Sequence, residues 1–177
     1  MLLLSINACY SKQNSKRWLI LKKIALFVDI QNIYYTTRQA YQRQFNYREL
    51  WQQLSNQGEI VLANAYAIAR QDDQQHKFQK ALKHIGFDVK LKPFIQRADG
   101  SAKGDWDVGI TIDVLEHAPN VDVVCLLSGD GDFDLLLQKV AAKYGIETWV
   151  YGVEQLTAQS LIYSASRFQP ITNGLLL

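Results

Sequence analysis

Short apolar runs alternate with helical stretches along most of this chain, and this alternation constrains the fold more than any other feature. Runs such as residues 24–28 and 121–127 are short and continuously apolar, as expected for strands buried in a parallel sheet. The expected strands are residues 24–28, 59–69, 87–95, 121–127 and 146–151. Helices are expected over residues 31–56, in two pieces around Phe45-Asn46, and over residues 72–85, 105–117, 131–144 and 154–164. The order predicts a three-layer α/β/α fold with a five-stranded, mainly parallel sheet.

The length and composition exclude several classes of protein. With 177 residues, 48% of them hydrophobic and 20% charged, the chain is sized and composed for one globular domain. Its two cysteines, Cys9 and Cys125, exclude a disulfide scaffold, and the absence of a CxxC pair argues against a zinc finger. No apolar run reaches the roughly 18–20 residues of a membrane helix, so no membrane association is expected.

The first residues do not have the pattern of a secretory signal. Residues 1–22 lack a basic segment before a short apolar stretch, and we therefore expect a cytoplasmic protein. We expect residues 1–22 to be an extension that is disordered, loosely docked or not native, and residues 23–177 to form a single domain.

The modest net charge of +2 hides an asymmetry along the chain. Residues 1–23 carry five basic and no acidic residues, and residues 24–97 carry ten basic and six acidic residues. Residues 98–177 carry four basic and eleven acidic residues. The basic half suits a polyanion and the acidic part suits a cation, although chance variation explains such segments equally well.

Carboxylates follow two of the expected strands and begin the helix between them. Asp29 ends the first strand, and Asp130 and Asp132 follow the fourth. Either Asp105 or Asp107 belongs to the start of the intervening helix. Because ligand sites in such sheets lie at the carboxyl ends of strands, we expect these acids to converge. Converging carboxylates repel one another unless a cation intervenes, and oxygen ligands alone suit Mg²⁺ or Mn²⁺.

Each aspartate alone has a simpler interpretation as a helix cap, but clusters at successive strand ends favour a shared site. Asp113 is six residues beyond Asp107, about 120° around the helix, and is either an outer partner of the site or a solvated acid. The histidines fall on expected helices away from the strand ends, where we expect surface positions: His76, His84 and His117.

Three motifs lie at these positions: FVDIQN at residues 27–32, KGDWDV at residues 103–108 and SGDGDF at residues 128–133. Together they resemble the motifs of the NYN domain, in the LabA-like branch of the PIN-like nuclease superfamily. Their order and spacing match the family, and the likeness covers about residues 22–170. SGDGDF after a buried strand is the most specific of the three, and KGDWDV is the weakest by itself.

The resemblance implies a PIN-like fold with sheet order 3-2-1-4-5 and a metal-dependent ribonuclease that uses Mg²⁺ or Mn²⁺. By matching position, it implies four metal-holding, catalytic acids: Asp29, Asp107, Asp130 and Asp132. It also implies that Asn32 and Ser128 support this cluster and that Lys103 contacts phosphate or supports the site. Asp105 is an extra acid at a position that the family leaves variable, so the match favours Asp107.

The basic residues after the strands are candidates for binding RNA phosphates, foremost Arg70 and Arg97, beside Lys103, Arg38 and Arg43. Tyr34, Tyr35 and Trp106 can stack bases, although packing is the preferred interpretation of Tyr34 and Tyr35. A recessed acidic site reaches an unpaired strand more easily than a duplex, so single-stranded RNA is the expected substrate.

Two other functions need comparison with a nuclease. A non-catalytic module that binds RNA or protein on the same fold would keep the acids for structure, and metal would not change its stability. A phosphatase of the haloacid dehalogenase type usually needs a second acid two residues after the first, where this chain has Gln31. A Walker loop and a GxGxxG motif are both absent, which argues against a phosphate-cradling nucleotide fold.

Overall fold

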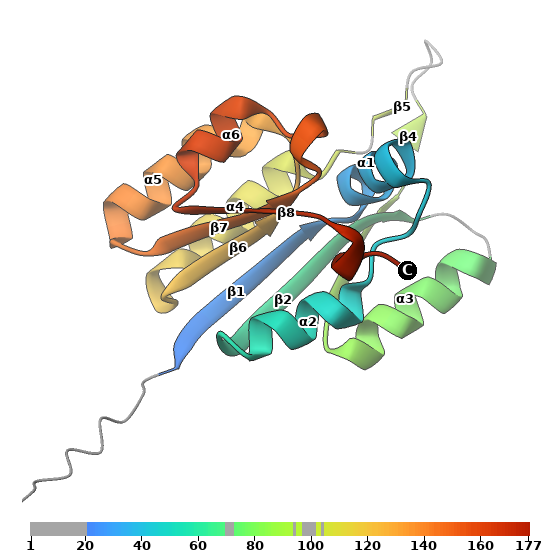
Figure 1. Cartoon of the computed structure of the whole chain (residues 1–177), viewed down its shortest axis with the longest axis horizontal. Helices are drawn as coiled ribbons and strands as arrows, with labels where there is room; N and C mark the ends of the chain where they lie inside the picture. Colours follow the sequence, from blue (N-terminus) through green and yellow to red (C-terminus); the bar gives the residue numbers. More distant parts are fainter. Residues whose placement is uncertain (1–20, 70–72, 94, 97–101, 104) are drawn as a thin grey trace, which may run out of the picture.

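A single six-stranded parallel sheet is the frame of the molecule (Figure 1). The computed structural model describes residues 21–69, 73–93, 95–96, 102–103 and 105–177. The strands follow the order β3-β2-β1-β6-β7-β8, and all adjacent pairs are parallel. Their bounds are β1 (Lys22–Asp29), β2 (Gly58–Ala69), β3 (Asp88–Pro93), β6 (Val123–Leu127), β7 (Glu147–Gly152) and β8 (Arg167–Pro170). A separate antiparallel pair is formed by β4 (Ile95–Gln96) and β5 (Ala102–Lys103).

Helices cover both faces of the sheet. One face is covered by α1 (Ile30–Tyr41), α2 (Tyr47–Ser55) and α3 (Asp73–Ile85). The other is covered by α4 (Asp107–His117), α5 (Asp134–Tyr144) and α6 (Gln159–Ser164). Short 3₁₀ turns are η1 (Ala118–Asn120), η2 (Gly131–Phe133), η3 (Glu154–Leu156) and η4 (Asn173–Leu175).

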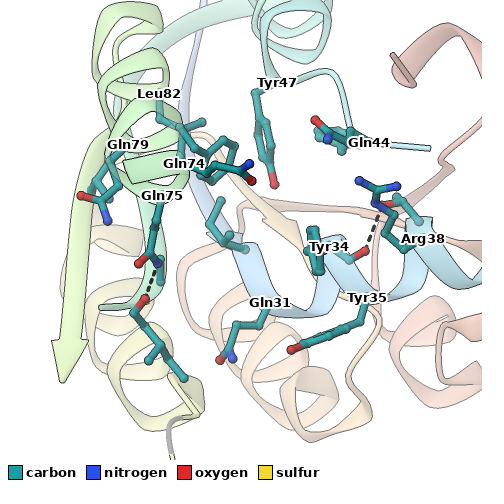
Figure 2. A pocket seen from close by; sticks show the side chains of 17 residues that line it. Gln31, Tyr34, Tyr35, Arg38, Gln44, Tyr47, Gln74, Gln75, Gln79 and Leu82 are labelled. Carbon is teal, nitrogen blue, oxygen red and sulfur yellow. Dashed lines mark hydrogen bonds between the residues drawn. The ribbon is translucent and has the colours of Figure 1, made fainter. Parts of the chain in front are cut away.

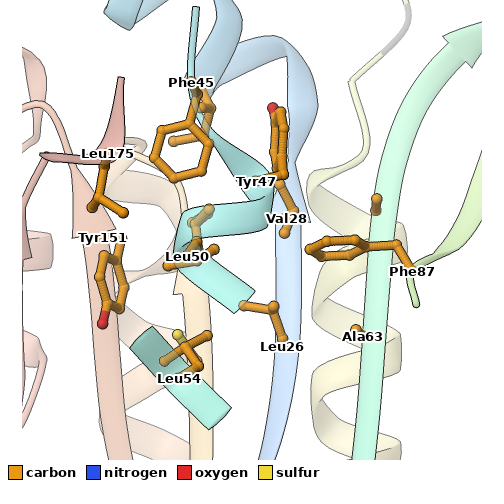
Figure 3. Packing of buried hydrophobic residues seen from close by; sticks show 14 of the residues in the cluster. Leu26, Val28, Phe45, Tyr47, Leu50, Leu54, Ala63, Phe87, Tyr151 and Leu175 are labelled. Carbon is orange, nitrogen blue, oxygen red and sulfur yellow. The ribbon is translucent and has the colours of Figure 1, made fainter. Parts of the chain in front are cut away.

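Alternation along each central strand divides the core into two halves. Leu26 and Val28 of β1 pack toward Leu50 and Leu54 of α2 (Figure 3). Phe27, between them in sequence, belongs to the opposite half of the core. Successive side chains of a strand point to opposite faces, so a strand covered on both sides must be apolar throughout. This explains the continuous apolar runs in the sequence.

The predicted strands and their order are confirmed, but the sheet has one strand more than expected. The predicted order 3-2-1-4-5 corresponds to β3-β2-β1-β6-β7, and β8 extends it at the β7 edge. The sequence of β8 (RFQP) has no apolar run, and none of its residues is buried. An edge strand is covered on fewer sides and accepts proline, so neither signal of a buried strand is present. The antiparallel pair of β4 and β5 is also absent from the prediction, because each strand has only two residues.

The expected helices are present with small changes at their ends. The stretch 31–56 divides as predicted, because Gln42 ends α1 in the left-handed conformation and the Asn46 side chain caps α2. Residues 131–133 form the turn η2 before α5, and the expected helix over residues 154–164 is η3 followed by α6. Residues 1–20 of the expected N-terminal extension lie outside the described residues.

Within the described part of the chain, no helix combines the length and apolar character needed to span a membrane.

Candidate active site

The site lies where the direction of strand order changes. From β1 the chain continues to β2 and β3 on one side, and it later returns to β6 and β7 on the other. The carboxyl ends of β1 and β6 therefore lie side by side, and the connections that leave them diverge. Ligands of open α/β sheets bind in the crevice formed at such a switch point.

Asp29 ends β1 and also caps α1. Its Oδ1 accepts a hydrogen bond from the Asn32 backbone N–H at 3.1 Å, so the cap interpretation of this residue is correct. Its Oδ2 lies 3.5 Å from the Ser128 hydroxyl, at the end of β6. The two strand ends are thus connected at the carboxylate.

The turn after β6 is held by a hydrogen bond to the first motif and by two hydrogen bonds within the turn. The Asn32 Oδ1 accepts from the Gly129 backbone N–H at 2.8 Å, which ties α1 to this turn. The buried Ser128 Oγ accepts from the Asp130 N–H at 3.2 Å. Asp130 Oδ1 accepts from the Asp132 N–H at 3.0 Å, so Asp130 caps η2. Asn32 and Ser128 therefore fix the backbone that carries both acids.

Three carboxylates converge at this edge. Asp107, Asp130 and Asp132 each offer an oxygen, and these oxygens lie within 4.8 Å of one another. Asp107 is the first residue of α4, where the positive end of the helix dipole favours a carboxylate. Asp105 is exposed and does not belong to this group. Asp29 also lies outside the group of three, but its charge is close enough to repel those of Asp107 and Asp130.

Burial and mutual repulsion oppose ionisation of these acids. Burial, followed by the charges of Asp107 and Asp130, raises the pKa of Asp29 to about 6. Burial also raises the pKa of Asp107, helped by the charge of Asp130 and then by those of Asp105 and Asp132. Lys92 is the nearby cation that counteracts the shift at Asp107. A divalent cation would relieve this repulsion.

Trp106 positions the start of α4. Its indole N–H donates to the Ala67 carbonyl of β2 at 2.9 Å, and its ring lies 5.2 Å from that of Tyr66. The Lys92 ammonium lies 5.3 Å from the Trp106 ring and donates to the Asp105 carbonyl at 3.0 Å. The stacking role considered for Trp106 is thus accompanied by a clear packing role. Nothing in the sequence pattern indicated Lys92.

Asp113 belongs to a separate network. Its Oδ2 accepts from the Tyr66 hydroxyl at 2.5 Å and from the Lys90 ammonium at 2.6 Å. Burial alone raises the pKa of Asp113, but the hydrogen bonds from Lys90 and Tyr66 outweigh it and lower that pKa below its ordinary value. The interpretation of Asp113 as a solvated acid is wrong, because this residue ties α4 to β2 and β3. Its role as an outer partner of the site stays a prediction.

The structure describes only some of the residues that are expected to contact RNA. Arg70 and Arg97 lie outside the described residues, and Lys103 is placed in β5 by its backbone only. Arg43 is used within the fold, since it donates to the carbonyls of Leu177 and Leu176.

The preferred packing interpretation of the α1 tyrosines is wrong. Tyr34 is 51% exposed and Tyr35 is 53% exposed, and both line an open pocket rather than the core. The Arg38 guanidinium lies 5.8 Å from the Tyr34 ring. His76 and His84 are exposed and His117 is half-buried at the far end of α4 from Asp107.

This fold and the three sequence motifs define a class. The chain matches the NYN domain over residues 23–172 and belongs to the NYN domain family. That family is part of the PIN-like nuclease superfamily, whose members are generally nucleases.

Two relatives show how far the likeness extends. The chain is 29% identical over 154 residues to the low amplitude and bright protein LabA of Synechococcus elongatus, covering 82% of each chain. It is 51% identical to a protein of unknown function from Vibrio parahaemolyticus whose crystal structure superposes with a TM-score of 0.85. That match covers 89% of this chain and 98% of the other. The fold and the family are shared over nearly the whole described chain.

Proposed function

We propose that this protein is a metal-dependent ribonuclease that hydrolyses phosphodiester bonds of single-stranded RNA. The proposed metal-holding and catalytic acids are Asp29, Asp107, Asp130 and Asp132. The observation that carries the proposal is the convergence of three carboxylates within 4.8 Å at the switch point of the sheet. Membership of a family related to nucleases supports it.

The donor set fits a hard divalent cation. The three convergent groups are all carboxylates, and their mutual repulsion adds to burial in raising the pKa values of Asp29 and Asp107. Such oxygen donors suit Mg²⁺ or Mn²⁺ rather than zinc. When bound, an ion of this kind lowers the pKa of a water molecule and offsets negative charge on the phosphate.

The protein's own residues would hold this arrangement in place. Asn32 and Ser128 fix the turn that carries Asp130, and the position of Asp107 depends on the anchoring of Trp106. In the absence of an ion the cluster repels an RNA phosphate, so positioning of the substrate requires cations around it. We assign phosphate contacts to Arg70, Arg97 and Lys103 as part of the proposal.

The test is cleavage of a labelled unstructured RNA by the purified protein with Mn²⁺, with Mg²⁺ and with EDTA. We expect cleavage with either metal and none with EDTA. Asp130→Asn keeps the cap of η2 but removes one charge, and we expect it to lower the rate by about a hundredfold or more.

Glu116→Gln is the matched control, because Glu116 is an exposed acid near the far end of α4. Its cleavage rate should equal that of the wild type. Equal cleavage by the wild type and Asp130→Asn would indicate a contaminating nuclease. RNA binding without cleavage in any metal would instead indicate a non-catalytic binding module.

A further inference from the structure

A pocket lies beside the start of α1, on the opposite face of the sheet from α4. It has a volume of about 370 Å³ and lies between α1, α3 and the end of β2 (Figure 2). Sites for small ligands are typically about 300–1,000 Å³, so a nucleoside-sized group fits. Neither the sequence motifs nor the family membership assigns a role to this pocket.

The lining is rich in glutamine. Gln31 comes from α1, Gln44 from the linker to α2, and Gln74 and Gln79 from α3 (Figure 2). Arg38 is the one charged side chain among the described residues of the lining. Each amide offers both donors and an acceptor, the combination that matches the edges of nucleobases. The pocket therefore favours a flat, polar group without positive charge.

The hydroxyl of a largely buried tyrosine points into this space. Tyr47 is only 8% exposed, and its ring is held by Phe45, Phe78 and Phe87 at centroid distances of 4.9, 5.6 and 6.1 Å. In Figure 2 its hydroxyl lies between Tyr34 and α3. No residue in the described part of the chain makes a hydrogen bond with this hydroxyl, whose oxygen is accessible from the pocket. A ligand in the pocket therefore meets a hydroxyl that can both donate and accept a hydrogen bond.

An aromatic ring and a cation lie at the mouth of the pocket. Tyr34 is half-exposed, and the Arg38 guanidinium lies 5.8 Å from its ring. A flat exposed ring is a stacking surface for a base, and an arginine beside it suits the attached phosphate. The two features occur together at one opening.

Two residues of the pocket lining are neighbours of Asp29 in sequence. Ile30 and Gln31, which line it, directly follow Asp29. Burial raises the pKa of the Tyr47 hydroxyl, and the negative charge of Asp29 raises it further. Asp29 is therefore close enough to Tyr47 for their charges to interact. The Ile30 and Gln31 end of the pocket therefore lies next to the carboxyl end of β1.

We propose that the pocket lined by Tyr34, Tyr47 and the glutamines of α1 and α3 binds an unpaired base of the RNA strand. The base stacks on Tyr34 and its polar edge meets Tyr47 and the amides. The inference rests on the proposed nuclease function, because the bound base would place the neighbouring phosphodiester at the acid cluster. It also explains a preference for single-stranded RNA, since a paired base cannot enter a pocket.

The experiment measures binding separately from cleavage. A short unstructured RNA with 2-aminopurine at one position is titrated into Asp130→Asn protein in EDTA. The fluorescence of this base analogue reports its stacking. Added to this background, Tyr34→Ala should weaken binding roughly tenfold, as expected for the loss of one stacking ring. Tyr47→Phe should weaken it about fivefold, as expected for the loss of one hydrogen bond.

Tyr163 offers matched controls, because it is 82% exposed on α6, on the other side of the sheet. Tyr163→Ala and Tyr163→Phe should bind RNA as the background does. Tyr47→Phe removes a hydroxyl without a partner in the protein, so its unfolding midpoint should not fall. Equal binding by the Tyr34, Tyr47 and Tyr163 variants would overturn the proposal.

Further outcomes of these experiments distinguish the base pocket from the nuclease function. Metal-dependent cleavage whose KM is unchanged by Tyr34→Ala and Tyr47→Phe would reject the base pocket and leave the nuclease standing. If Tyr34→Ala and Tyr47→Phe weaken RNA binding but the protein cleaves RNA in no metal, the base pocket stands and the nuclease function is rejected. If the same variants weaken binding of free mononucleotides but not of RNA, the pocket serves a free nucleotide and the RNA proposal fails.

Discussion

Single aspartates at the candidate site have two structural roles each. Asp29 caps α1 while its other oxygen faces Ser128, and Asp130 caps η2 while it contributes to the group of three carboxylates. The cap and the site interpretations of these residues are therefore compatible. The capping hydrogen bond orients the carboxylate. Burial of the Asp29 carboxylate raises the free-energy cost of ionising it.

This cost predicts how stability depends on pH. The pKa of Asp29 is raised from 3.8 to about 6, so the folded protein holds the proton to a higher pH than the unfolded chain does. The resulting stabilisation is fully present below about pH 4 and is lost as the pH rises through about 6. The loss is on the order of 3 kcal/mol or less.

Asp29→Asn should remove this loss, because asparagine keeps the cap but has no charge. We expect the variant to gain stability relative to the wild type as the pH rises from about 4 to about 7, measured by urea unfolding in EDTA. Glu116→Gln serves again as a control away from the cluster. Wild-type and Asp29→Asn stabilities that stay parallel across this range would contradict the prediction.

At the scale of elements, two helix-to-strand turns end on glycine in a left-handed conformation. Gly86 follows α3 with φ +127°, and Gly145 follows α5 with φ +66°. The surroundings differ, since a Cβ at Gly86 would lie 2.6 Å from the Trp51 ring and a Cβ at Gly145 meets nothing within 4 Å. One turn is thus constrained by its backbone and by packing, and the other by its backbone alone.

Alanine at each position tests these constraints. Gly145→Ala should cost about 1 kcal/mol, from the left-handed backbone alone. Gly86→Ala should cost about 1–3 kcal/mol more, because φ +127° lies outside the left-handed region that alanine can adopt and because the Trp51 ring must also move. Chemical unfolding of both variants gives the difference, and equal costs would show that the backbone and Trp51 both adjust freely.

At the scale of the whole molecule, the last residues close the fold over the linker between α1 and α2. The Asn46 N–H donates to the Leu175 carbonyl, and the Leu177 N–H donates to the Gln44 carbonyl, both at 2.8 Å. Leu175 is buried in the core near Phe45 (Figure 3). Segments about 130 residues apart in sequence therefore support one another beside the pocket.

Truncation of this contact should destabilise the whole molecule. Leu175→Ala leaves a cavity in the core and should cost about 2–5 kcal/mol in urea unfolding. Leu177→Ala should cost little, because the Leu177 side chain is 65% exposed. If the two variants are equally stable, the C-terminal residues do not contribute to the core as described.

The sequence alone was sufficient for the fold class, the order of five strands and the family. A strand buried on both faces must be continuously apolar, and the three motifs lie at the ends of such strands, so local patterns carry this information. The pattern failed for β8, whose residues are not buried and therefore show no apolar run.

Tertiary structure decided which side chains meet. It places Asp107 rather than Asp105 with Asp130 and Asp132, and it gives Asp113 to Lys90 and Tyr66. It also forms the pocket from glutamines and tyrosines on separate helices, none of which stands out by spacing. The physical reason is that apolar periodicity is a local pattern, which reports the burial of one element. A site depends on how several elements that are distant in sequence pack together.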